Sequence, residues 1–215
     1  ERLEDFLDLA KDLSKKAGYQ GKFFYHYPMK VNQNKEVVMA LVGEGAHLET
    51  SSYNDLWLVK KMLEQETFNP NIRILCSGPK TDKYISLIDD LQHKGVKIFP
   101  LIEGPNELKF LQYSKYDVGI RLDMPIKASS YWNKPIDRFG FSAKDILNMG
   151  SFKNLKILHY HIGSQIEKLS DVLGPVKYAL DVYFKLKEKN PSLDTIDIGG
   201  GMPIPYTRNK SYPID

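Results

Sequence analysis

The stretch NIRILCSGPKTDKYISLIDDLQHKGVKIFPLIE, residues 71–103, contains the unit from which the fold follows. Its two ends, NIRILCSG (71–78) and VKIFPLIE (96–103), are short apolar runs of the kind found in buried strands. Between them, DKYISLIDDLQHKG (82–95) has apolar residues at helical spacing and closes on Gly95, which indicates the end of a helix. The stretch therefore predicts a strand–helix–strand unit.

The same alternation runs through the whole sequence, about seven times, with short connections. Outside residues 71–103 we expect helices at 2–16, 34–43, 52–65, 106–114, 142–150 and 171–190, and strands at 22–32, 46–50, 117–124, 155–165 and 193–201. A longer loop is expected over 124–138. Strands and helices that alternate in this way form a parallel sheet covered by helices, so the fold class is α/β.

Two parallel architectures compete. A doubly wound sheet normally has a glycine fingerprint at its first strand-to-helix turn, and KVNQNK (30–35) has none. About seven consecutive units favour a (β/α)8 TIM-type barrel, whose functional groups gather at the carboxyl ends of the strands. Because such a barrel has eight strands and about 250 residues, we expect residues 1–215 to be one incomplete barrel domain, truncated after about seven units.

Composition excludes several classes of protein. The net charge is only +3 and the lysines are interspersed with acidic residues, which disfavours a nucleic-acid partner. No apolar run approaches the roughly 20 residues that cross a bilayer, and the acidic, amphipathic start (1–18) is unlike a signal peptide. The single cysteine, Cys76, lies in an apolar run, where a packed, inert thiol is expected. We therefore expect a cytoplasmic protein with neither nucleic acid nor membrane as partner.

Charged side chains close several of the apolar strands. Lys30 ends the strand expected at 22–32, and burial of an ammonium lowers its pKa, which suits an amine that forms a Schiff base. The alternative is a lysine that extends to solvent from the strand end. Glu49 and Arg121 each end a later strand, where the residues fit an internal Arg–Glu ion pair as well as a ligand role.

The stretch HYHIGSQ (159–165) carries two histidines on alternate positions. Alternation would place His159 and His161 on one face of a strand. A metal site would need a third ligand, and the nearby acidic residues lie beyond the strand end, so no metal site is expected. His159, the deeper of the two, is expected to pack in the core.

The stretch DIGGG (197–201) follows the last expected strand. Three glycines in a row, Gly199, Gly200 and Gly201, allow backbone N–H groups to approach an anion closely, as phosphate binding requires. The alternative, a tight turn with positive φ, explains one glycine better than three. HIGSQ adds the hydroxyl of Ser164 at the preceding strand end, and late strand ends of a barrel commonly bind phosphate. Together, an amine, a phosphate cradle, an imidazole, an arginine and a carboxylate suit pyridoxal phosphate.

Three motifs in this order and spacing resemble a known family. YPMKVNQN (27–34), HYHIGSQI (159–166) and DIGGGMPIPY (197–206) are similar to the pyridoxal-phosphate-dependent, alanine-racemase-like barrel decarboxylases. YPMKVNQ, RFGF (138–141) and HIGSQ are most similar to biosynthetic arginine decarboxylases. The resemblance covers essentially the whole chain.

The resemblance implies cofactor contacts for eight residues: Lys30, Glu49, Arg121, His161, Ser164, Gly199, Gly200 and Gly201. Lys30 and His161 would be catalytic, as the Schiff-base lysine and as the ring stacked on the pyridine. Ser164 and the glycine amides would hold the phosphate. Arg121 would contact the phenolic oxygen of the cofactor, with Glu49 near that oxygen. Arg138 occupies a position that faces the partner subunit in relatives.

The resemblance also implies an activity. We expect a carboxy-lyase that converts a basic amino acid, L-arginine before others, to its amine (agmatine) and CO2, as in polyamine and spermidine biosynthesis. The alternatives are a diaminopimelate, ornithine or lysine decarboxylase of the same fold, or a non-catalytic pyridoxal-phosphate-binding barrel. A homodimer or larger homo-oligomer is implied, and magnesium is allowed although no site for it is visible.

Relatives carry later segments that these 215 residues do not contain. Those segments supply the glutamate that pairs with the pyridine nitrogen and a C-terminal β domain. We therefore expect the 215 residues alone to be inactive.

Overall fold

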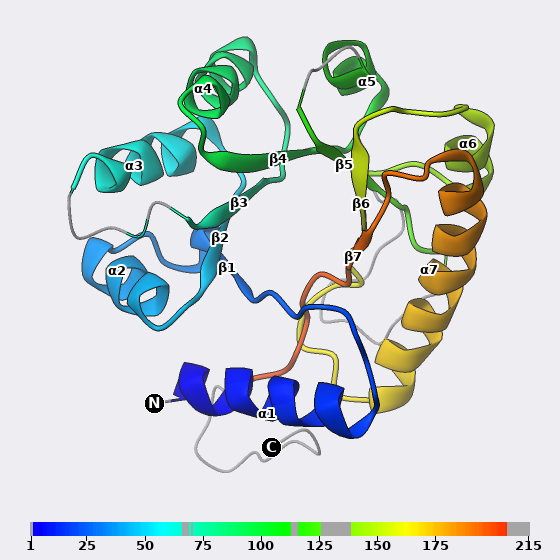
Figure 1. Ribbon diagram of the computed structural model, residues 1–215, viewed down its shortest axis with the longest axis horizontal. Coiled ribbons are helices and arrows are strands. Elements are labelled where there is room, and N and C mark those ends of the chain that lie inside the picture. The colour runs from blue at the N-terminus through cyan, green and yellow to red at the C-terminus, as the bar shows by residue number, and fades with distance from the viewer. Residues whose placement is uncertain (1, 66–68, 70, 113–115, 126–138, 206–215) are drawn as a thin grey trace. The chain divides into compact units, whose positions relative to one another are not determined.

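The computed structural model describes residues 2–65, 69, 71–112, 116–125 and 139–205. It divides into two compact units, Glu1–Pro100 and Leu101–Asp215, which are described separately. Strands and helices alternate along the chain (Figure 1), every strand pair is parallel, and the strand order is β1-β2-β3-β4-β5-β6-β7. Parallel strands that follow one another in sequence order have the connectivity of the (β/α)8-barrel class, as the sequence predicts.

The first unit contains four strands and the helices that follow or precede them. Its elements are α1 (Arg2–Lys16), β1 (His26–Pro28), η1 (Met29–Val31), α2 (Lys35–Gly43), β2 (His47–Thr50), α3 (Tyr53–Leu63), β3 (Arg73–Cys76), α4 (Asp82–His93) and the first part of β4 (Lys97–Ile102). Asn34, Ser52 and Thr81 each begin a helix by accepting a backbone N–H bond, which supplies a partner at the helix N-terminus. Helices α2, α3 and α4 lie on one side of the strands (Figure 1), where the unit's apolar core forms.

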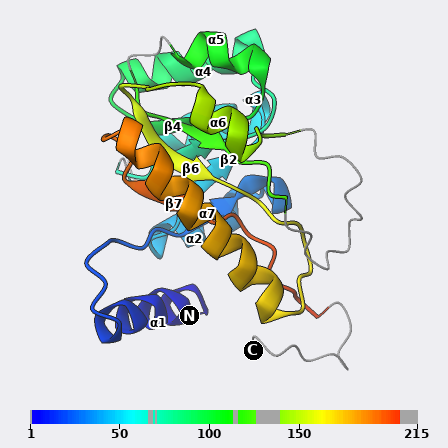
Figure 2. The same cartoon turned by 90° about the vertical axis from the view of Figure 1, so that its right-hand side faces the viewer.

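The second unit begins within β4. It continues with α5 (Pro105–Gln112), β5 (Val118–Arg121), α6 (Ala143–Asn148), β6 (Leu155–His159), α7 (Leu169–Lys189) and β7 (Thr195–Asp197). Figure 2 shows α7 lying across β6 and β7. Ala179, Val182 and Leu186 of α7 are buried in the same apolar cluster as Leu155 and Leu158 of β6.

All seven strands are shorter than the stretches predicted from the sequence, most of all β1, β6 and β7. The strand expected over 22–32 is limited to β1 and is followed at once by the 3-10 turn η1. Pro28 has no N–H for a further ladder bond, which explains why the strand ends there. β6 ends at His159, because its neighbour β7 turns away at Gly199, where φ is +64°.

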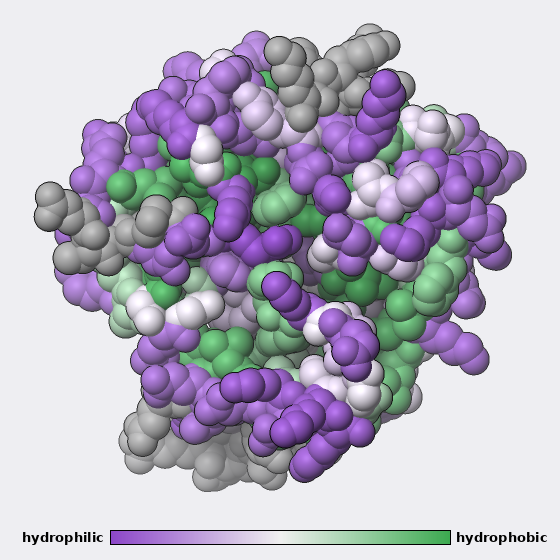
Figure 3. Space-filling view, in the orientation of Figure 1, coloured by the Kyte–Doolittle hydropathy of each residue, from purple (hydrophilic) through white to green (hydrophobic). Residues whose placement is uncertain are grey.

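Among the described residues, no helix is long and apolar enough to cross a membrane. In the space-filling view, hydrophilic side chains cover most of the visible surface, and hydrophobic ones show between the elements and along α7 (Figure 3). Residues 126–138 of the expected loop lie outside the described residues, and the interpretation of Arg138 therefore does too.

Candidate functional site

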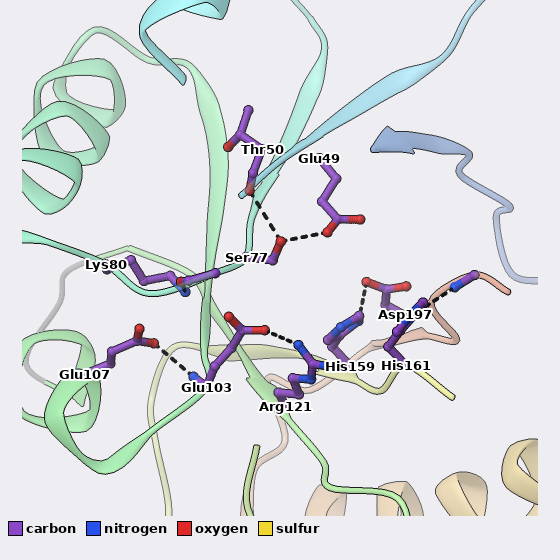
Figure 4. Close-up of polar contacts among 12 residues, drawn as sticks. Glu49, Thr50, Ser77, Lys80, Glu103, Glu107, Arg121, His159, His161 and Asp197 are labelled. Carbon is purple, nitrogen blue, oxygen red and sulfur yellow. Dashed lines mark hydrogen bonds and ion pairs between the residues drawn. The ribbon is translucent and has the colours of Figure 1, made fainter. Parts of the chain in front are cut away.

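Four ionisable residues lie in one row across the carboxyl ends of β4 to β7 in the second unit (Figure 4). Arg121, His159 and Asp197 are register partners on adjacent strands. Glu103 follows Ile102, which pairs with Ile120, and so extends the row by one strand. Parallel strands bring their carboxyl ends to one edge of a sheet, which explains how residues far apart in sequence form this row.

Arg121 is held by a buried carboxylate. Its Nη1 lies 2.6 Å from Oε1 of Glu103, and the two side chains are 13% and 1% exposed. The backbone N–H of Glu103 donates to Oε2 of Glu107 (2.9 Å), and the Arg121 guanidinium lies 5.3 Å from the ring centre of Phe139. Arg121 was predicted from the sequence and Glu103 was not, although Glu103 also follows an apolar strand and the same rule could have found it.

His159 is buried, as expected of a packed core histidine, but it also has a specific partner. Its Nδ1 lies 2.8 Å from Oδ2 of Asp197, and the side chains are 5% and 22% exposed. The other oxygen of Asp197 accepts the backbone N–H of Gly199 (2.9 Å). Burial and the nearby charge of Asp197 raise the pKa of Tyr160.

The glycine run after β7 forms a cradle without side chains. Gly199 and Gly201 have φ of +64° and +128°, and a Cβ at either would lie within 2.7 Å of a backbone oxygen, of Tyr160 and Gly163 respectively. Gly200 differs, because a Cβ there would meet nothing within 4 Å. Two of the three glycines are thus required by the turn itself, and the third leaves open space beside a backbone N–H. This arrangement fits a phosphate group.

His161 lies two residues beyond β6, half-buried, and contacts the cradle. Its Nδ1 accepts the backbone N–H of Gly200 at 3.4 Å, and the N–H of Ile166 donates to the carbonyl of Gly201 (2.9 Å). The structure therefore brings His161 and the glycine run together, and Ser164 lies half-buried in the same connecting loop. The expectation that both histidines share a strand face is wrong, because only His159 belongs to the strand.

Gln165 ties the same two loops together from a strained position. Among the described residues it is the one non-glycine residue with positive φ, at 56°. Its side-chain amide donates to the carbonyl of Ile204 and accepts the N–H of Ile204, each at 2.9 Å. Residues other than glycine adopt this backbone conformation mainly where surrounding contacts enforce it, so the clamp explains the strain.

In the first unit, Lys30 lies in η1 and is exposed. The burial that the sequence argument invoked for its amine is therefore not found. The loop around it is held on both sides: the Tyr27 hydroxyl donates to the carbonyl of Asn32 (3.1 Å), and the Gln33 amide donates to the buried Asp55 (3.2 Å).

Glu49 of β2 is held by a hydroxyl from the next strand end. Oγ of Ser77 donates to Oε1 of Glu49 at 2.6 Å (Figure 4). The Ser77 N–H donates to the carbonyl of Thr50 at 2.8 Å. Ser77 directly follows β3 and was not singled out by the sequence. Within the described residues, no group of three or more His, Cys, Asp or Glu is placed to hold a metal ion.

A family model matches residues 5–213, nearly the whole chain, and its description is pyridoxal-dependent decarboxylase, pyridoxal binding domain. The chain belongs to this family. Together with the strand order, this confirms the resemblance on which the sequence interpretation rested.

Two curated relatives are biosynthetic arginine decarboxylases. The one from Bacteroides thetaiotaomicron is 29% identical over 98% of this chain and 36% of its own length. The one from Proteus mirabilis is 29% identical over 90% of this chain and 33% of its own length. The chain thus spans about a third of the length of these relatives.

Solved structures show the same fold. The biosynthetic arginine decarboxylase of Campylobacter jejuni has a TM-score of 0.77 at 24% identity, over 93% of this chain and 35% of that one. The diaminopimelate decarboxylase of Helicobacter pylori, complexed with L-lysine, has a TM-score of 0.72 at 22% identity, over 97% and 55%. At these identities the likeness concerns the fold.

Proposed function

We propose that this chain is the cofactor-binding domain of a pyridoxal-phosphate-dependent carboxy-lyase that converts L-arginine to agmatine and CO2. The observation that carries the proposal is the glycine cradle after β7, open at Gly200 and contacted by His161, in a chain matched almost throughout by the family model. Arginine is favoured among substrates because the curated relatives named above are arginine decarboxylases. Since the chain spans about a third of their length, the activity is proposed for the protein at its full natural length.

The cofactor, when bound, withdraws electrons from the substrate α-carbon so that its carboxylate can leave as CO2. The exposed amine of Lys30 is accessible for the covalent link to it. We assign the phosphate to the amides of Gly199, Gly200 and Gly201 and to Ser164, with Gly200 the most open of the glycines. His161 presents a flat ring beside this cradle, suited to stacking on a pyridine.

Arg121 and Glu49 are assigned to the phenolic side of the cofactor. A guanidinium has five N–H donors, more than the bond to Glu103 uses, so Arg121 can bind a further oxygen without releasing its partner. Glu103 fixes the orientation of that guanidinium and neutralises its charge. Ser77 fixes one oxygen of Glu49 and leaves the other for a proton or a hydrogen bond.

The remaining assignments follow from the same resemblance. We propose that residues 1–215 form one cofactor-binding domain, that the protein is a cytoplasmic homodimer or larger homo-oligomer, and that it serves polyamine biosynthesis. We further propose that the 215 residues by themselves do not turn over substrate. Magnesium has no candidate ligand cluster among the described residues.

The decisive experiment measures CO2 release by the full-length protein, loaded with pyridoxal phosphate, from arginine, ornithine, lysine and diaminopimelate. The proposal predicts that arginine has the highest kcat/KM and yields agmatine. If another of these amino acids has the highest kcat/KM, that amino acid and not arginine is the substrate. Cofactor binding without turnover of any of them would favour a non-catalytic pyridoxal-phosphate-binding protein.

A further inference from the structure

His159 has no cofactor contact in the proposed function, yet it has a partner that packing alone does not require. Its side chain is almost completely buried, and its Nδ1 lies 2.8 Å from Oδ2 of Asp197. Asp197 is the residue that opens the DIGGG stretch, so the contact joins the end of β6 to the start of the glycine cradle.

The same carboxylate continues the connection. Oδ1 of Asp197 accepts the N–H of Gly199 at 2.9 Å, while Oδ2 contacts His159. Because one carboxylate makes both bonds, the orientation of the imidazole determines where the Gly199 amide is held. Gly199 is also where the chain turns with positive φ and where a Cβ would lie 2.4 Å from the carbonyl of Tyr160.

Further backbone contacts extend the connection to the rest of the cradle. The N–H of Tyr160 donates to the carbonyl of Asp197 (3.0 Å), and the N–H of Ile166 donates to that of Gly201 (2.9 Å). The bond from the Gly200 N–H to His161 is longer, at 3.4 Å, and is correspondingly weaker. The turn is therefore held firmly at both ends. The N–H of Gly200, at its centre, can exchange His161 for another acceptor at small energetic cost.

We propose that His159 is a positioning residue for phosphate binding: through Asp197 it fixes the Gly199 turn, so that the cradle is formed before the cofactor arrives. Because the Gly199 N–H donates to Asp197, the phosphate assignment given above narrows to the amides of Gly200 and Gly201, and Gly199 contributes the turn. The inference rests on the proposed function and deepens it, because it separates the glycines that bind the phosphate from His159, which holds the turn in place. A preformed site binds more tightly because less order has to be imposed on binding.

The test uses the full-length protein freed of cofactor and compares its dissociation constants for pyridoxal 5'-phosphate and for pyridoxal. Their ratio isolates the phosphate contribution, since both ligands carry the aldehyde that reacts with a lysine. His159→Leu, which removes the Nδ1 donor, is expected to reduce this ratio about tenfold, the effect of losing one well-placed hydrogen bond to a charged group. His159→Asn, whose amide can replace Nδ1, is expected to restore the ratio to within about twofold.

Asn190 provides the matched control. It is fully buried in the same unit, and its Oδ1 accepts the N–H of Phe152 at 2.7 Å. Asn190→Leu removes a buried hydrogen bond without touching the cradle, so it is expected to lower stability and leave the ratio unchanged. A ratio that falls equally in Asn190→Leu and His159→Leu would show a general effect of destabilisation and overturn the inference.

Amide hydrogen exchange of the cofactor-free protein gives a readout independent of the cofactor. Exchange over residues 197–204 is expected to be faster in His159→Leu than in the unsubstituted protein, and unchanged in Asn190→Leu. Should His159→Leu not fold, His159→Phe removes the same donor and keeps a flat ring. Unchanged exchange and an unchanged ratio in the folded variant would overturn the positioning role. If the unsubstituted protein binds pyridoxal phosphate no better than pyridoxal, the proposed function itself is contradicted, whereas the exchange result still tests the His159 contact.

Discussion

Glu103 and Arg121 form an ion pair in which the carboxylate is almost completely buried. Their Oε1 and Nη1 atoms lie 2.6 Å apart, with side chains 1% and 13% exposed. Removal of one partner from such a pair leaves an uncompensated charge in a poorly solvated position. The pair therefore orients a guanidinium that is proposed to contact the cofactor, and it also makes the second unit sensitive to loss of either charge.

Glu103→Leu is expected to lower the free energy of unfolding by about 3 kcal/mol, because it leaves the Arg121 guanidinium unpaired. Urea denaturation of the cofactor-free protein measures this change. The control is Glu64→Gln, which removes the carboxylate of the exposed Lys61–Glu64 pair at the C-terminal end of α3 and is expected to leave the midpoint unchanged. If the two substitutions lowered the free energy of unfolding equally, burial would not be what makes the Glu103–Arg121 pair important for stability.

Gly199→Ala is expected to lower the stability of the protein, whereas Gly200→Ala is expected to weaken its binding of the cofactor. Gly199→Ala forces a Cβ to within 2.4 Å of a backbone oxygen at positive φ, which is expected to destabilise the protein by at least about 1–2 kcal/mol. At Gly200 a Cβ has space, so Gly200→Ala is expected to fold normally but to weaken pyridoxal phosphate binding. Thermal unfolding and cofactor titration separate the two effects. Normal cofactor affinity in Gly200→Ala would argue against a phosphate at this position.

His47 is expected to make the stability of the first unit depend on pH. Burial lowers its pKa, and the positive charges of Arg73 and Lys97 lower it further. Since the folded pKa lies below the unfolded value, the unfolded chain binds more protons as the pH falls, and stability is lost below about pH 6.5. His47→Asn, which can still accept the Arg73 N–H that now bonds to Nδ1, is expected to flatten this dependence. An unchanged slope between about pH 5 and pH 7 in denaturation curves would exclude His47 as its source.

Cys76 is expected to be unreactive in the folded protein. It is fully buried, burial raises the pKa of its thiol, and Thr50 Oγ1 lies 3.4 Å from its sulfur. Because the thiolate is the reactive form, a disulfide reagent is expected to modify Cys76 only as fast as the protein opens. Modification of the native protein at the rate of a free thiol would show that β3 is more accessible than the structure indicates.

The alternation of short apolar runs with amphipathic segments was sufficient to predict the seven strands and their helices, because each pattern reflects burial on one side of a parallel sheet. Strand ends were predicted less well. The short β1 depends on Pro28, and the end of β6 depends on a neighbouring strand that turns away at Gly199. Such an end is decided by the partner strand, which no local pattern contains.

The residues that carry the chemistry of the site could be predicted from the sequence, whereas most of the side chains that contact them could not. Lys30, His161 and the glycine run were identified from their motifs, whereas the partners Glu103, Ser77 and Asp197 were not. Glu103 follows an apolar strand and could have been found by the rule that identified Arg121, whereas Ser77 and Asp197 become recognisable only when the fold places them beside Glu49 and His159. For Lys30 the sequence left open a buried amine and a lysine that extends to solvent, and the structure shows it exposed in η1, two residues beyond β1.

Borohydride reduction of the full-length holoprotein, followed by peptide mass mapping, shows whether Lys30 anchors pyridoxal phosphate. Reduction makes a link between an amine and the cofactor aldehyde permanent, so the modified residue can be located. We expect a pyridoxyl group on the peptide that contains Lys30, and its loss in Lys30→Ala. A folded, cofactor-supplied protein with no adduct on Lys30, or with the adduct on another lysine, would contradict this expectation.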